Sequence, residues 1–456
     1  MPFVPHTSQD EQLMLDVIGV DKLEDLFDEI PGELRAGVLA NTPKAITEKE
    51  LLRLMSDRAK LDEVKLSFLG AGAYEHHIPS AIWDIVTRGE FMTAYTPYQA
   101  EASQGTLQLI YEFQSMITRL TAMEVANASV YDGASALAEA VLMSVRANRG
   151  SKSRRVLMAG NVHPKYRQAC ENIIRSQKIE IETLDWDDET GVINHQQLKA
   201  HEGEDYAALV IAYPSFFGGL EDAARLTDWA HAQNQLVIGV VNPTAMGLIQ
   251  PPGEWGETGA DIVVGEGQPL GIPIASGGPY LGFMCCRQAF VRQMPGRIIG
   301  KTVDTEGKTG FALTLQAREQ HIRRAKATSN ICTNQGLLVT AATIYMSLVG
   351  DEGLRSIASQ CHNGMVKLIQ GLVKIPGAGR RFSAPVFHEV VIQLAQPAKA
   401  VLAKMASDGI LGGYDLGEVD PSLADCLLTN ITETKNDADI EMFLSSLARA
   451  LEVESC

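Results

Sequence analysis

Five short apolar runs, separated by longer amphipathic helical patterns, constrain the fold of this chain more than any other feature. The runs are bounded by Gly, Pro or Asn, are rich in β-branched residues, and stand in SRRVLMAG, IEIETLDW, YAALVIAYPS, QLVIGVVNP and GADIVVG. Runs of this kind, with helical patterns between them, are typical of parallel strands that are buried on both faces. The sequence therefore predicts an α/β fold with a mainly parallel sheet covered by helices.

The length of the chain, 456 residues, exceeds the size at which one hydrophobic core keeps growing, so we expect more than one domain. Residues 1–60 hold short amphipathic segments separated by Pro31, Gly32 and Pro43, which predicts an N-terminal helical arm. The apolar runs predict a large domain over residues 61–330. A long helical pattern follows Asn334, and further helix and strand patterns predict a smaller C-terminal α/β domain over residues 331–456.

The charge of the chain argues against two classes of partner. A formal net charge of −17 opposes binding to nucleic acid and to anionic lipid. The one dense basic run, from Arg318 to Lys326, has two open interpretations: it holds a phosphate or carboxylate, or it forms ion pairs with neighbouring acids.

The cysteines and the N-terminus predict a soluble cytoplasmic protein that does not span a membrane. Seven cysteines are scattered without a C-x-x-C pair, which favours reduced thiols. The first residues lack the basic and apolar regions of a signal peptide, and no run of about 18 apolar residues is present.

Histidines and glycines near residue 75 invite a metal or nucleotide interpretation, which we do not favour. His76 and His77 are adjacent and point in different directions in any regular structure, and we predict no metal site. Gly70 and Gly72 resemble the start of a dinucleotide fingerprint, but Glu75 stands at the third glycine position. A turn whose backbone passes close to another surface is the preferred interpretation.

The order of the motifs resembles that of fold-type I pyridoxal-phosphate enzymes. Asp132, Gly133 and Ser135 precede an alanine-rich helix whose first N–H groups could hold a phosphate, with simple N-capping as the alternative. His163 follows a strand at a place where such enzymes stack a side chain on the cofactor ring.

Two groups that pyridoxal chemistry requires are missing from their expected positions. Gln268 stands where the cofactor lysine is expected, and a primary amide cannot bond covalently to the cofactor aldehyde. Asn242 stands where an aspartate normally holds the pyridine nitrogen protonated. Because both groups are absent together, the sequence predicts a subunit that no longer anchors the cofactor itself.

Three motifs make the resemblance specific: YTPYQAEASQG from Tyr95, MPGRIIG from Met294, and REQHIRRAKATSNICT from Arg318. Over essentially its whole length the chain resembles the glycine cleavage system P-protein family, and in length and in VVGEGQPLGIP it is similar to the subunit 1 (α) type. The resemblance implies a glycine decarboxylase with a β subunit, whose histidine-lysine pair binds pyridoxal phosphate. Gly267 and Gln268 stand at the matching places here. It also implies transfer of the aminomethyl group of glycine to a lipoylated H-protein.

The resemblance places the active site at the interface between the α and β subunits, to which this chain would add polar groups. The expected substrate-lining residues are Tyr95, Thr96, Tyr98, Gln99 and Glu101, with interface packing as the alternative for the tyrosines. The expected donors to the partner's cofactor phosphate are Thr328, Ser329 and Asn330.

Two reactive side chains near the third motif have alternative interpretations. Cys332 is either a redox-sensitive thiol or, as we prefer, an inert buried one. Lys326 is the competing amine for covalent cofactor binding, although its position in the sequence does not match the fold. Two other functions therefore remain open: a scaffolding or regulatory protein with a degenerate fold, and a self-sufficient enzyme that uses Lys326.

Overall fold

The computed structural model describes residues 5–35, 41–92 and 94–452, and the chain divides into two units, residues 1–63 and 64–456. Cys456, one of the seven cysteines, lies outside the described residues. The first unit contains helices α1 (Ser8–Ile18) and α2 (Glu48–Leu61). Both helices begin with a capping box, in which a threonine accepts from the N3 amide and the N3 acid accepts from the threonine amide.

The apolar side chains of the first unit are mostly exposed to solvent. Leu15 is its one buried hydrophobic residue among those described, whereas Val17 is 88% exposed and Leu52 is 62% exposed. The described residues of this unit bury too little apolar surface to form a hydrophobic core that would stabilise it alone.

A seven-stranded sheet forms the centre of the second unit, and its four parallel pairings confirm the mainly parallel α/β prediction. At one side of the sheet β2 is antiparallel to β8, and β8 is antiparallel to β7. The sequence patterns did not predict β2 and β8. In spatial order the strands are β2 (Val125–Ala126), β8 (Gly282–Cys286), β7 (Ile262–Glu266), β6 (Leu236–Val241), β5 (Ala208–Tyr213), β3 (Arg155–Ala159) and β4 (Glu180–Leu184).

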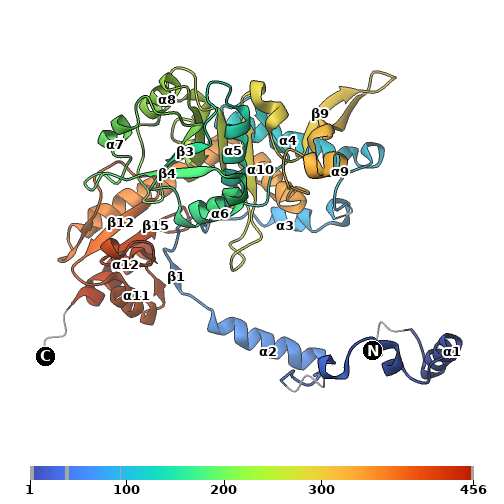
Figure 1. Ribbon diagram of the computed structural model, residues 1–456. Coiled ribbons are helices and arrows are strands. Elements are labelled where there is room, and N and C mark those ends of the chain that lie inside the picture. Colours follow the sequence, from blue (N-terminus) through green and yellow to red (C-terminus); the bar gives the residue numbers. More distant parts are fainter. Residues whose placement is uncertain (1–4, 36–40, 93, 453–456) are drawn as a thin grey trace. The chain divides into compact units, whose positions relative to one another are not determined.

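Helices cover the central sheet. Every residue of β7 is buried, and since successive side chains point to opposite faces, both faces are covered there. Helix α5 packs on β7 and β8, and α8 packs on β5 and β6 (Figure 1). The helices of this part are α3 (Ala81–Val86), α4 (Gln104–Thr121), α5 (Gly133–Ala147), α6 (Pro164–Ile174), α7 (His195–Ala200), α8 (Ala223–Ala232) and α9 (Gln320–Arg323).

A second, antiparallel sheet and two helices form the C-terminal part of the chain, which Figure 1 shows beside the central sheet. The sheet order is β11 (Ala378–Arg380), β12 (Glu389–Leu394), β15 (Cys426–Asn430) and β14 (Tyr414–Asp415). The helices are α11 (Ala398–Ser407) and α12 (Asp437–Leu451). Two pairs of strands lie outside both sheets: β1 (Leu66–Ser67) is parallel to β13 (Ile410–Leu411), and β9 (Ile298–Val303) forms a hairpin with β10 (Thr309–Thr314).

Helix α10 (Gly336–Leu372) contributes to two hydrophobic cores. Its buried residues up to Cys361 belong to the core of the central sheet, and those from Met365 belong to the core of the C-terminal sheet. Gly350 interrupts the helix with a φ of 62°. By length and composition α10 could cross a membrane, but its buried residues make it a shared core helix. Phe68 lies in the second core, so the chain contributes to that core before it builds the central sheet.

Gly218 lets the loop after β5 approach β12 closely. Its φ is +81°, and a Cβ atom would overlap the carbonyl oxygen of Glu389. Gly203 has almost the same φ, +82°, with nothing within 4 Å of a Cβ atom. The two glycines therefore separate the cost of backbone conformation from the cost of a steric clash.

We expect Gly218→Ala to lower the free energy of unfolding by more than roughly 2 kcal/mol, because the clash adds to the conformational cost. Gly203→Ala should lower it by only about 1 kcal/mol. Chemical denaturation of both variants measures the difference. Equal losses would show that the approach to Glu389 is loose.

Candidate functional site

Gln268 lies in the turn directly after β7, and its side chain is engaged on both sides. The side-chain amide donates to the carbonyl oxygens of Tyr74 (2.9 Å) and Ile272 (2.8 Å). Its oxygen accepts from the backbone N–H of Tyr74 at 2.9 Å. Gln268 thus pairs with the N–H and C=O groups of one residue, Tyr74, as a neighbouring strand would. With 1% of its surface exposed, Gln268 is a buried structural residue. A lysine has donors only and could not make this pair of bonds.

Glu266, at the end of β7, places a carboxylate at the start of helix α5. One oxygen accepts from the backbone N–H of Gly133 at 3.0 Å. The other accepts from the backbone N–H groups of Gln268 (3.0 Å) and Leu281 (2.8 Å). Burial raises the pKa of Glu266 to about 7, although these hydrogen bonds favour the charged form.

The turn before α5 is closed by its own side chains. Asp132 accepts from the backbone N–H of Ser135 at 2.7 Å, and the Ser135 hydroxyl accepts from the Asp132 N–H at 3.1 Å. This reciprocal pair is a capping box, so the capping alternative describes Ser135 as the structure shows it. The Gly133 N–H donates to Glu266, and the Ser135 hydroxyl donates to the carbonyl oxygen of Asp132. Neither Gly133 nor Ser135 therefore directs a free donor toward a phosphate.

His163 does not face an open ring site. It caps helix α6, where its Nδ1 atom accepts from the Lys165 N–H at 3.1 Å, and its Nε2 atom lies 2.7 Å from the carbonyl oxygen of Ala71. Its ring stacks on Tyr166 with 4.8 Å between the centroids. Gly72 permits this approach, since a Cβ atom there would lie 2.7 Å from His163 Nε2. The predicted close approach of the glycine turn is thereby confirmed.

Asn242 follows β6 as predicted, and its side chain serves the next turn. Its oxygen accepts from the backbone N–H groups of Thr244 (2.9 Å) and Ala245 (3.3 Å). Its nitrogen lies 3.4 Å from His388 Nε2. Asn242 therefore places no negative charge at the end of β6.

A cavity of about 70 Å³ lies between these residues, lined by Tyr74, His163, Tyr166, Asn242 and Glu266 among others. Sites for drug-sized ligands and cofactors measure roughly 300–1,000 Å³. Pyridoxal phosphate does not fit a cavity of this size, and Glu266 already uses the Gly133 N–H at the start of α5.

Residues from three separate motifs meet at a second place, which we call the Tyr98 face (Tyr95, Thr96, Tyr98, Arg297, His321 and Cys332). The Arg297 guanidinium lies 5.5 Å from the centre of the Tyr98 ring, and Nη2 lies 3.5 Å from its hydroxyl. Glu319 reaches Arg297 Nε at 3.8 Å and His321 at 3.7 Å. Of these two cationic residues only His321 belongs to the basic run, and its contact is an ion pair only when the ring is protonated, so both interpretations of the run stay open.

Arg297 is the buried centre of this face. It is 1% exposed, and among the described residues its Nη1 atom has no hydrogen-bond partner and its Nε atom has only the 3.8 Å contact with Glu319. Above it, Tyr98 is 57% exposed. A buried guanidinium with unpaired N–H groups is costly, and such groups are found at functional sites or where a partner completes them.

Tyr95 and Thr96 connect the face to the segment that precedes α10. The Thr96 hydroxyl lies 3.0 Å from that of Thr333, and the Cys332 sulfur, by its charge, raises the pKa of the Tyr95 phenol. Tyr95 is 76% exposed. Cys332 is exposed too, so the preferred prediction that it is a buried thiol is wrong. It lies in an irregular segment where apolar neighbours do not cover it.

The other predicted interface residues lie in short turns. Gln99 and Glu101 are exposed: Gln99 directly precedes the 3₁₀ turn Ala100–Ala102, and Glu101 lies within it. Thr328 is half-buried and Asn330 exposed, whereas the Ser329 hydroxyl already donates to Glu139 of α5 at 2.8 Å.

Lys326 is exposed and lies in the turn Arg324–Lys326, outside the central sheet. It is therefore not at the end of β7, where the fold brings Gln268.

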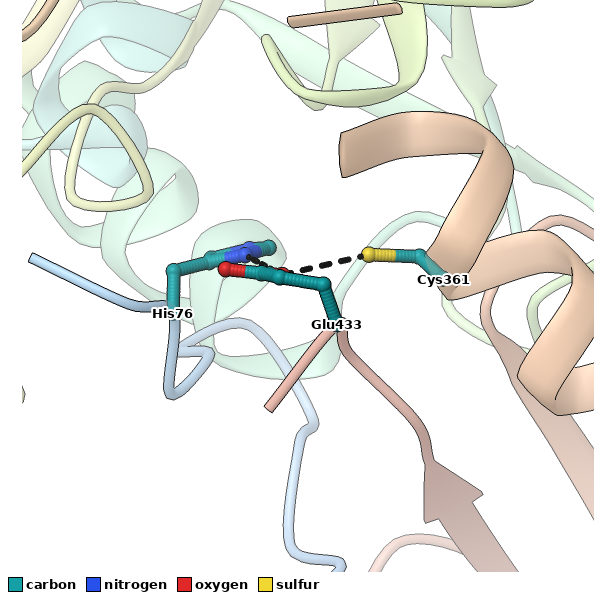
Figure 2. Close-up of side chains that lie close together, drawn as sticks. All are labelled: His76, Cys361 and Glu433. Atoms are coloured by element: carbon teal, nitrogen blue, oxygen red, sulfur yellow. Dashed lines mark hydrogen bonds and ion pairs between the residues drawn. The ribbon is translucent and has the colours of Figure 1, made fainter. Parts of the chain in front are cut away.

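A buried group that the sequence did not predict joins His76, Cys361 and Glu433. Figure 2 shows Glu433 between the other two side chains, with His76 Nδ1 at 2.7 Å and Cys361 Sγ at 3.5 Å from one carboxylate oxygen. The ligand atoms lie within 4.8 Å of one another, close enough for an ion to be considered. Tetrahedral zinc would hold the nitrogen and oxygen about 3.3 Å apart, so 2.7 Å fits a hydrogen bond better. The sequence prediction of no metal site stays a prediction.

Sequence reasoning also missed Glu266, Tyr166, Arg297 and Glu389. The sequence does carry a signal for Glu266, because an acid two residues before Gln268 ends an otherwise apolar strand. Glu389 accepts from the Ala71 N–H at 2.7 Å and from the Tyr74 hydroxyl at 2.8 Å, and it lies 318 residues from Ala71 in the chain. No local sequence pattern predicts a contact between residues so far apart in the chain.

We expect Gln268→Leu to lower the free energy of unfolding by roughly 2–4 kcal/mol, because it leaves three buried main-chain groups without partners. Gln393→Leu is the matched control at an exposed position of β12, and it should change stability by less than about 0.5 kcal/mol. Urea denaturation compares them. Equal effects would mean that the Gln268 bonds do not stabilise the turn.

Glu389 should make stability depend on pH. Burial raises its pKa from 4.5 to about 7. The contribution of the protonated Glu389 carboxyl to the free energy of unfolding is therefore complete below pH 4.5 and is lost as the pH rises through 7. Glu389→Gln removes the ionisation, so relative to the wild-type protein it should gain roughly 1–3 kcal/mol between pH 5 and pH 8. Denaturation at both values measures this gain. The exposed control Glu63→Gln should show none, and a constant offset for Glu389→Gln would contradict the prediction.

Comparison with known proteins gives these sites their context. The family model for the glycine cleavage system P-protein matches residues 1–447. A probable glycine dehydrogenase (decarboxylating) subunit 1 from Alcanivorax borkumensis is 60% identical over 452 residues, 99% of this chain and 100% of that protein. The corresponding protein of Legionella pneumophila strain Philadelphia 1 is 58% identical over 447 residues, 98% of each chain.

Solved structures agree with the sequence relatives. A crystal structure of glycine decarboxylase (P-protein) in inhibitor-bound form has a TM-score of 0.87 and 37% identity, covering 99% of this chain and 100% of that one. Glutamate decarboxylase from Lactobacillus brevis shares the fold alone, with a TM-score of 0.66 and 14% identity over 92% of this chain and 95% of that one. The predicted fold-type I class is thereby confirmed. The chain belongs to the glycine cleavage system P-protein family.

Proposed function

We propose that this chain is the subunit of a glycine decarboxylase that completes an active site on a β partner. Together they decarboxylate glycine and transfer its aminomethyl group to the lipoyl group of H-protein. The observation that carries the proposal is a contrast between two places. The cradle expected to hold pyridoxal phosphate, which lies between Glu266, Gln268 and the start of α5, has only about 70 Å³ left open. The Tyr98 face is exposed above the buried Arg297, whose Nη1 atom has no hydrogen-bond partner among the described residues. The name subunit 1 of the relatives also implies a partner.

The Tyr98 face adjoins helix α5, the element that carries the phosphate turn in this fold. The Tyr131 hydroxyl, one residue before that turn, accepts from the Cys332 N–H at 3.0 Å. Ser329 donates to Glu139 of the same helix. A partner seated on this face would meet the α5 end of the chain, where we place the shared site.

Pyridoxal phosphate bound covalently on the partner supplies the electron sink for loss of carbon dioxide. The groups of this chain orient and enclose the substrate. Arg297 donates toward the Tyr98 oxygen, so the Tyr98 proton is free to be donated outward to the glycine carboxylate. Tyr95, Thr96, Gln99 and Glu101 would line the same wall and exclude water.

The turn Thr328–Asn330 would contact the cofactor phosphate of the partner. Thr328 and Asn330 have no side-chain bond among the described residues that would prevent this, whereas Ser329 is held by Glu139. We therefore assign donation to Thr328 and Asn330, and assign to Ser329 the role of fixing the turn. We further propose that the complex is cytoplasmic and is a dimer of αβ pairs, which a mass measurement tests.

A scaffolding protein with a degenerate fold is the second candidate, favoured by the filled cradle itself. The partner's activity distinguishes the two. If the β subunit alone decarboxylates glycine at the full rate of the complex, this chain is a scaffold.

We expect Tyr98→Phe and Tyr95→Phe to lower turnover of the assembled complex by roughly 10-fold or more, because each removes a hydroxyl that orients the substrate. Assembly, measured by size-exclusion chromatography with light scattering, should not change. Tyr414→Phe, in strand β14, is the matched control and should leave the rate unchanged. Unaltered rates for both face variants would remove these tyrosines from the site.

A further inference from the structure

Pyridoxal phosphate does not fit the cradle between Glu266, Gln268 and the start of α5 in this chain. We propose that the Glu266 carboxylate is a built-in substitute for the cofactor phosphate, which keeps the cradle closed. This inference concerns the chain's own cradle and holds whether or not the Tyr98 face completes a partner's site.

The hydrogen bonds of Glu266 have the form of an anion site. Three backbone N–H groups, from Gly133, Gln268 and Leu281, converge on its two oxygens at 2.8–3.0 Å. Gly133 is the first residue of a 15-residue helix, whose exposed N–H groups and dipole favour a negative charge. A ligand phosphate would need the same donors, and they are already used.

Neighbouring side chains fill the rest of the space that a ligand would need. The Tyr166 hydroxyl lies against Gly133, where an added Cβ atom would be only 2.6 Å from it. The Tyr166 ring stacks on His163, and Gln268 is held by Tyr74 and Ile272. The cavity that remains measures about 70 Å³.

Charge opposes a second anion at the same place. Asp132, next to Gly133, already caps α5, and Glu266 lies across the first turn from it. Each carboxylate raises the cost of ionising a neighbour, and burial with the Asp132 charge raises the pKa of Glu266. An incoming phosphate would meet two acids and no free cation among the residues that line the cavity. Restoring a lysine at position 268 alone would therefore leave the cradle closed.

Removing the Glu266 side chain should turn the cradle into a phosphate site. We expect Glu266→Ala, made in the full chain, to show a saturable rise of a few degrees in Tm with inorganic phosphate, against chloride at equal ionic strength. The wild-type chain should show no such rise. If Glu266→Ala does not fold in chloride, phosphate should increase its folded yield on refolding.

Glu221 provides the matched control. It too is a buried glutamate, and it accepts from Asn161 and the Ile193 N–H. Glu221→Ala should lose stability as Glu266→Ala does, but phosphate should not restore it. A phosphate effect of equal size in the wild-type chain or in Glu221→Ala would overturn the proposal, and so would a Glu266→Ala chain that phosphate neither stabilises nor rescues.

A second measurement tests the closed cradle with the cofactor itself. Gln268→Lys, incubated with pyridoxal phosphate and reduced with borohydride, should carry no label at position 268 by peptide mapping. The double variant Glu266→Ala with Gln268→Lys should be labelled there. Labelling of Gln268→Lys alone would show that Glu266 does not exclude the cofactor.

Discussion

The end of strand β7 is the point on which the arrangement of the chain depends. There the carboxylate of Glu266 and the amide of Gln268 together bind six main-chain groups. These groups belong to the start of α5, the turn after β7, the entry to β8 and the segment around Tyr74 that follows β1. In open α/β sheets ligands bind at such a crossing, outside the carboxyl ends of the strands, because the N-terminus of a helix offers unsatisfied donors there. Here side chains satisfy them.

A site that is satisfied internally changes what the chain can contribute. A ligand-free cradle with unpaired donors would be costly to bury, whereas a cradle closed by the chain's own groups is stable without a ligand. The unpaired capacity lies instead at Arg297, under the exposed Tyr98 ring. At the cradle Glu266 uses the backbone donors at the start of α5, although the Ser215 hydroxyl that lines the cavity has no partner among the described residues. At the Tyr98 face the buried Arg297 guanidinium itself is incompletely paired.

Sequence reasoning predicted the elements well and the contacts poorly. The five apolar runs became β3 to β7. Four of them are largely buried strands, which leave a pattern in their own residues, whereas β4 is a partly exposed edge strand. Gln268 and Asn242 could be placed by their strand ends for the same reason. Glu389, Arg297 and Glu433 could not, since Ala71, Tyr98 and His76, which they contact, each lie more than 190 residues away from them in the chain. The exposure of Cys332 was missed because a general tendency of cysteine was applied to a segment without regular structure.

The course of α10 has a consequence for how the protein unfolds. Its first half is part of the core around the central sheet, and its last turns are part of the core around the antiparallel sheet. Between Asp351 and Leu372 the helix runs without a break from one core into the other, since Gly350 is its one interruption. Loss of one core would fray the same hydrogen-bonded helix that supports its neighbour. The two cores should therefore be lost cooperatively, as a single calorimetric transition, although the chain is long enough for two independent ones.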